Sequence, residues 1–112
     1  MTRIGYLMWS TSLLASALAD GHASAQESGH PGQGLALARQ VCSECHAIDR
    51  TQARSPNAAA PRFETIANIP GMTAMALSVA LQTPHRTMPN VMLNADELGN
   101  IVAYILSLQG AN

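Results

Sequence analysis

The clearest hydrophobic pattern lies near the end of the chain. Four apolar residues at spacings i, i+3, i+4 and i+7 share one helical face: Leu98, Ile101, Val102 and Ile105. Asn94 precedes this face and Glu97 stands three residues further on, a pair that is typical of a helix start. Gly110 follows where a helix would stop. The pattern therefore predicts an amphipathic helix over residues 94–108.

The rest of the chain predicts shorter helices separated by long loops. Residues 34–41 and 72–82 carry apolar side chains at helical spacing, and residues 63–68 favour a short helical turn. Pro84 and Pro89 bracket a stretch that cannot be helical in its middle. No stretch alternates like a strand. We therefore expect an all-α domain of three to four short helices, whose long loops argue against self-sufficient packing.

The first 25 residues have the pattern of a secretory signal peptide. Arg3 gives a positive start, residues 4–19 are largely apolar, and residues 23–25 read Ala-Ser-Ala, the small residues that precede cleavage. A second cleavage site ends the Ala-Leu-Ala sequence at residues 17–19. A retained membrane anchor is the alternative, but the apolar run is interrupted and short for a bilayer span. We expect residues 1–25 to be removed during export to the periplasm.

Residues 26–112 would then form one small domain with no permanent membrane anchor. Five arginines stand against six acidic residues in this part, and the chain contains no lysine. Without a basic stripe, nucleic acid is excluded as an expected partner. A domain this short has only marginal stability unless a cross-link or a bound cofactor adds to it. We expect a monomer.

Residues 42–46 read Cys-Ser-Glu-Cys-His, the C-x-x-C-H pattern. Two thiols three residues apart match the two vinyl groups on one edge of a haem and can form thioethers with them. The histidine that follows at once can reach the iron. The motif therefore predicts one covalently bound haem c, attached at Cys42 and Cys45 and ligated by His46. An exported chain suits this prediction, because haem is attached to such proteins after export.

Three other uses of a cysteine pair suit this sequence less well. A thioredoxin-like redox motif needs a βαβ context, which the pattern does not provide. A zinc site needs two more ligands at similar spacing, and the chain has no further cysteine. A plain disulfide would leave the adjacent histidine without a role. A large apolar cofactor also resolves the conflict between long loops and a small core.

The sixth ligand of the iron is a separate question. Its candidates in the expected domain are Met72, Met75, Met88, Met92, His30 and His85. Met88 lies directly before a proline in the non-helical stretch, so its side chain can be held inwards, and it is the preferred ligand. His85 in the same stretch is the rival. We interpret Met72 and Met75 as core residues of a helix and Met92 as packing against the haem.

Residues 26–112 resemble the class I c-type cytochromes along nearly their whole length. The segments that carry the resemblance are Gly34…Ala38…Cys42-x-x-Cys45-His46, Pro61-Arg62-Phe63, Met88 and Ile101-Val102-Ala103-Tyr104. The resemblance implies the cytochrome c fold, wrapped around one covalent haem. It also implies that Gly34 and Tyr104 meet where the first and last helices cross. Pro61 would accept a hydrogen bond from Nδ1 of His46 and raise the basicity of the ring.

Two features depart from the mitochondrial members of that family. The only tryptophan, Trp9, lies in the expected signal peptide, so Arg62, Arg86 or His85 would have to contact the haem propionates instead. The ring of lysines used for docking is absent, which leaves the partner surface open. The stretch around Met88 resembles small bacterial cytochromes more closely.

The resulting functional hypothesis is a periplasmic one-electron carrier, not an enzyme, with redox proteins as its donor and acceptor. A His/Met axial pair implies a comparatively high potential. A cytochrome subunit of a periplasmic dehydrogenase is the first alternative. A haem enzyme or gas sensor, which needs an open or displaceable sixth position, is the second.

Overall fold

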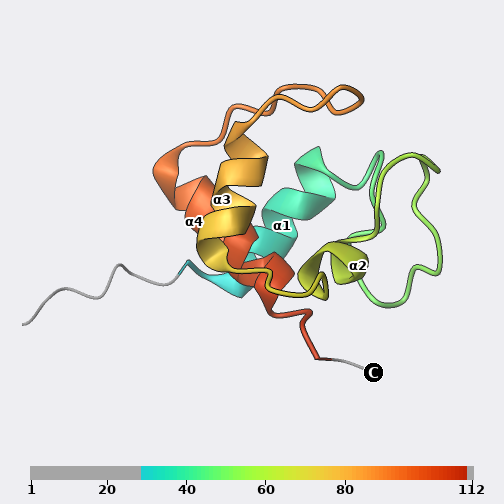
Figure 1. The fold of residues 1–112 in the computed structure, drawn as a ribbon, viewed down its shortest axis with the longest axis horizontal. Coiled ribbons are helices and arrows are strands. Elements are labelled where there is room, and N and C mark those ends of the chain that lie inside the picture. The colour runs from blue at the N-terminus through green and yellow to red at the C-terminus, as the bar shows by residue number, and fades with distance from the viewer. Residues whose placement is uncertain (1–28, 111–112) are drawn as a thin grey trace, which may run out of the picture.

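The computed structural model describes residues 29–110, and the elements of this part are all helical. The helices are α1 (Pro31–Val41), α2 (Phe63–Ala67), α3 (Ala74–Gln82) and α4 (Ala95–Leu106) (Figure 1). Residues 29–110 contain no strand, and their one isolated bridge joins His85 to Met88. The all-α prediction is confirmed. The expected signal peptide and its cleavage site lie outside the described residues.

Helix α4 starts where its sequence pattern places it. The Asn94 side chain accepts a hydrogen bond from the Glu97 amide at 2.9 Å, and the Glu97 carboxylate accepts from the Asn94 amide at 2.9 Å. This reciprocal pair satisfies two backbone donors that a helix start otherwise leaves free. The helix ends at Leu106, two residues earlier than predicted, and Gly110 follows with a positive φ of 72°.

We predict that Asn94→Ala lowers the free energy of unfolding by roughly 1 kcal/mol, the usual effect of losing such a cap. Asn94→Asp is the matched control, because its carboxylate can accept the same bond from the Glu97 amide. Thermal unfolding of the haem-loaded protein, followed by circular dichroism, measures the difference. Equal melting temperatures for the alanine and parent proteins would contradict the prediction.

Helix α1 crosses α4 at close range, as Figure 1 shows. A Cβ atom built on Gly34 would lie 2.0 Å from the carbonyl oxygen of Asn100 and 2.6 Å from Cβ of Tyr104, so only glycine fits there. The Asn100 side chain also accepts from the His30 amide at 2.7 Å and donates to the Gln33 side chain at 2.9 Å. The expected contact between Gly34 and Tyr104 is confirmed. These contacts extend α1 to Pro31, three residues before its predicted start.

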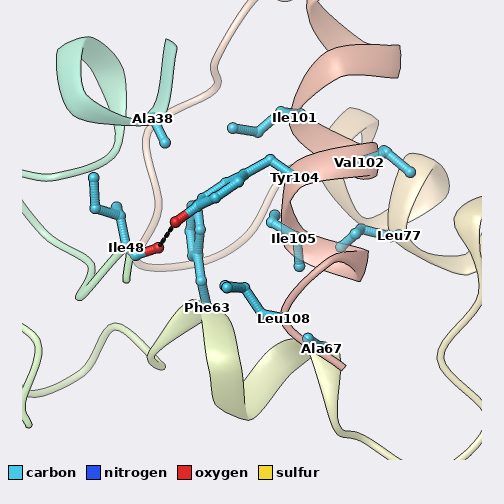
Figure 2. Packing of buried hydrophobic residues seen from close by; sticks show 10 residues of the cluster. All are labelled: Ala38, Ile48, Phe63, Ala67, Leu77, Ile101, Val102, Tyr104, Ile105 and Leu108. Carbon is cyan, nitrogen blue, oxygen red and sulfur yellow. Dashed lines mark hydrogen bonds between the residues drawn. The ribbon is translucent and has the colours of Figure 1, made fainter. Parts of the chain in front are cut away.

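The core lies against the inner face of α4, as Figure 2 shows. Its buried apolar residues include Ala38, Ile48, Phe63, Leu77, Ile101, Ile105 and Leu108. Tyr104 enters the same cluster and donates its hydroxyl to the carbonyl oxygen of Ile48 at 2.7 Å (Figure 2). Burial raises the pKa of this phenol, so it stays protonated and able to donate. One side chain of α4 therefore holds the segment that follows the Cys-x-x-Cys-His motif.

Helix α3 differs from its sequence prediction in its first residue and in the residue that it buries. It begins at Ala74 because the Thr73 hydroxyl accepts from the Ala76 amide at 3.1 Å, so Met72 lies before the helix. Met72 packs half-buried against the core, but Met75 is 77% exposed. The interpretation of Met75 as a core residue is therefore wrong. Leu77 is the residue of α3 that the core buries.

Candidate functional site

The Cys42–His46 segment continues the path of α1 as a tight hydrogen-bonded turn. The amides of Cys42 and Ser43 both donate to the carbonyl oxygen of Ala38 at 2.9 Å. The carbonyl oxygen of Cys42 then accepts from the amides of Cys45 at 3.2 Å and His46 at 2.9 Å. Both thiols and the imidazole thus belong to a single turn, whose backbone is held by hydrogen bonds at each end.

The two cysteines are half-buried and free. Burial raises the pKa of the Cys42 thiol, so the protonated form dominates at neutral pH. No group of three or more His, Cys, Asp or Glu side chains within residues 29–110 is arranged to hold a metal ion. The two free thiols lie three residues apart on one turn, an arrangement that fits the two thioether bonds of a haem c.

His46 is a buried imidazole with one nitrogen already engaged. Its side chain belongs to a residue only 9% exposed, and its Nδ1 lies 2.6 Å from the carbonyl oxygen of Pro61. Because a carbonyl oxygen can only accept, Nδ1 is the nitrogen that carries the proton in this bond. The ring is tilted by 48° against Phe63, with centroids 5.4 Å apart. The arrangement leaves Nε2 as the ring nitrogen suited to bind a metal.

The loop after this turn returns to it. The Asn57 amide donates to the carbonyl oxygen of Cys45 at 3.1 Å, and the Phe63 amide donates to that of Ala47 at 2.9 Å. Backbone hydrogen bonds before and after Pro61 therefore hold this residue beside His46. The position of Pro61 agrees with the one that the cytochrome resemblance implies.

Comparison with known proteins gives the same assignment. Over 97 residues the chain is 36% identical to cytochrome c-552 of Bradyrhizobium diazoefficiens, and the match covers 87% of this chain and 89% of that protein. The chain belongs to the c-type cytochromes. No family model and no solved structure matches it.

The protein is thus a small c-type cytochrome with the cytochrome c fold and one covalent haem c, which fits the Cys-x-x-Cys-His motif. Proteins of this family carry electrons between redox partners. None of the helices within residues 29–110 has the length and apolar character needed to cross a bilayer.

The side chains of residues 29–110 fit such a group. Five large apolar side chains of residues 29–110 are exposed rather than buried: Val41, Ile69, Met75, Val79 and Met92. Val41 directly precedes the haem-binding turn, Cys42–His46. Val79 and Met92 lie before and after the segment that contains Met88. A haem is a large apolar ring, and covering such side chains with it removes apolar surface from water.

The segment between α3 and α4 carries the candidates for the second axial ligand of this cytochrome. It projects from the helices, in orange, at the upper end of Figure 1, where the C-terminal end of α1 also lies. Met88 is half-buried in this segment, whereas His85 and Met92 are exposed. His30 lies elsewhere, at the start of α1. No hydrogen bond within the described residues joins Met88 to the haem-binding turn.

Arg62 is the best-placed of the three residues considered for the propionates. Its Nη2 donates to a carboxylate oxygen of Glu64 at 2.6 Å, and Nε of Arg50 lies 3.9 Å from the other oxygen. The Nε atom of Arg62 is buried and has no partner among the described residues. A buried donor without a partner is costly, and a propionate oxygen would satisfy it. Arg86 and His85 are both exposed.

Sequence reasoning missed one group of residues at this site. The sequence predicts only an irregular loop for residues 47–60, between the motif and Pro61. In the structure, the side chains of Gln52 and Ser55 bind the backbone immediately after His46. Such hydrogen bonds leave no periodic pattern in the sequence, because their partners are main-chain amides.

Proposed function

We propose that this cytochrome is a periplasmic one-electron carrier whose haem iron is ligated by His46 and Met88. The observation that carries the proposal is the hydrogen bond from Nδ1 of His46 to Pro61, which leaves Nε2 as the metal-binding nitrogen. A carbonyl acceptor at Nδ1 also makes the imidazole a stronger donor to iron.

Met88 is the proposed partner of His46 for four reasons. The second ligand must come from a chain segment well separated from the first, since it approaches the opposite face of the haem. Pro84 and Pro89 make the segment around Met88 rigid without making it helical. Helix α4 follows and can close the pocket. A thioether also reaches the iron without burying a charge.

The haem supplies a ferrous–ferric couple, and the protein sets the conditions for it. His46 and Met88 would fill both axial positions, so no substrate would bind the metal. A thioether favours the ferrous state relative to a second imidazole, which raises the potential. Cys42 and Cys45 would hold the ring covalently, and Arg62 would neutralise a propionate.

Carbon monoxide separates this proposal from a haem enzyme or gas sensor. We predict that the reduced native protein gives almost no difference spectrum with carbon monoxide at neutral pH, because Met88 occupies the sixth position. Protein unfolded in denaturant is the positive control. Full and rapid binding by the native protein would favour the enzyme or sensor alternative.

The proposed location rests on residues 1–25 alone. We predict that the haem-loaded protein purified from the periplasmic fraction begins at Gln26, as measured by intact mass and terminal sequencing. A chain that retains residues 1–25 and sediments with membranes would indicate an anchor instead.

A further inference from the structure

The two amides that follow His46 are buried and depend on side chains for their hydrogen bonds. Ala47 is 1% exposed and Ile48 is 3% exposed. The Ala47 amide donates to the Ser55 hydroxyl at 3.0 Å, and the Ile48 amide donates to Oε1 of Gln52 at 2.8 Å. Each bond joins a buried residue to a half-buried side chain, so each amide takes its acceptor from the loop.

The carbonyl groups of the same two residues are also engaged. The Ala47 oxygen accepts from the Phe63 amide at 2.9 Å, and the Ile48 oxygen accepts from the Tyr104 hydroxyl at 2.7 Å (Figure 2). All four polar backbone groups of this dipeptide are therefore paired. The two carbonyl oxygens bond to residues of α2 and α4, and the two amides bond to side chains of the loop.

We propose that Ser55 and Gln52 are positioning residues for the proximal ligand, an inference that rests on the proposed ligation of iron by His46. The peptide unit between His46 and Ala47 carries the amide that Ser55 binds. Fixing the plane of this unit fixes the direction in which the imidazole leaves the backbone.

The hydrogen bond from Nδ1 to Pro61 fixes the other degree of freedom, the rotation of the ring. The imidazole plane relative to the haem is thus set from two ends, by Pro61 at the ring and by Ser55 and Gln52 at the backbone. Removing one of the side-chain acceptors leaves a buried amide unpaired, and the segment must rearrange to expose it to water. The rearrangement turns the ring.

The ferric protein offers a direct readout, because the spread of the haem methyl NMR shifts depends on the orientation of the axial ligand planes. We expect Ser55→Ala and Gln52→Leu each to change this spread and the shifts of the His46 ring protons. Ser55→Thr and Gln52→Glu keep an acceptor oxygen and should restore the parent pattern. Thr51→Val is the matched control, because the Thr51 hydroxyl in the same loop bonds only the Asp49 carboxylate.

Unchanged methyl shifts in Ser55→Ala and Gln52→Leu would overturn the inference, as would an equal change in Thr51→Val. Hydrogen exchange of the native protein provides a test that needs no variant to fold. The Ala47 and Ile48 amides should exchange at least 100-fold more slowly than the exposed amides of the same loop, roughly as expected for buried bonded groups. Exchange at similar rates would also overturn it. Parent spectra without paramagnetically shifted His46 ring protons would instead contradict the proposed ligation itself.

Discussion

Replacing both Cys42 and Cys45 with alanine should leave a chain with little helix. Among residues 29–110 the core is small, and Val41, next to the Cys-x-x-Cys-His turn, is one of five large apolar side chains that are exposed. A domain of this length is marginal on its own core. Far-ultraviolet circular dichroism should therefore show the loss of most of the parent helical signal, with no cooperative thermal transition.

Ser43→Ala is the matched control for the double variant. Ser43 lies in the same turn, and its hydroxyl only donates to the carbonyl oxygen of Arg39 at 2.6 Å. This variant should keep its haem and its helical signal. A haem-free double variant that is well folded, with a sharp thermal transition, would show that the haem is not needed for folding.

Met88→Ala should change the iron site more than any other single substitution outside the haem-binding turn. We expect the ferric protein to lose its sulfur-to-iron charge-transfer band and the ferrous protein to bind carbon monoxide. The potential should fall by on the order of 0.1 V, within the roughly 0.8 V that axial ligands span. The physical reason is the loss of a thioether that stabilises ferrous iron.

Two controls separate Met88 from its neighbours. His85→Ala should keep the same axial pair and the band, since His85 is exposed in this segment. Met92→Ala should also keep the band, because Met92 is 85% exposed. If Met92→Ala removes the band and Met88→Ala does not, the ligand lies four residues later. If neither change matters, the site is open or bis-histidine, and the electron-carrier proposal weakens.

The parts of the fold that could be predicted from the sequence depend on local chemistry. The start of α4 follows from Asn94 and Glu97, which bond to each other's backbone, and this needs no information from the rest of the chain. The Cys-x-x-Cys-His turn is equally local. The crossing at Gly34 was available only from the resemblance, because a glycine in a helix pattern does not reveal which backbone approaches it.

The parts of the fold that could not be predicted depend on which helix face or loop side chain packs against which other element. The predicted apolar face of residues 72–82 includes Met75, yet the core buries Leu77, which lies on the other side of α3. Helical spacing gives a face but not its partner. Ser55 and Gln52 were missed for a related reason, since their partners are amides that any residue at positions 47 and 48 would supply.

The turn from Cys42 to His46 also has a stereochemical consequence. The two vinyl groups of a haem are not equivalent, and turning the ring over exchanges them. Because both thiols and the imidazole belong to one hydrogen-bonded turn of an L-peptide, the pairing of thiols with vinyl groups would decide which face of the ring meets His46. The two possible attachments are diastereomeric in this chiral turn, so they would differ in free energy although the ring itself is flat.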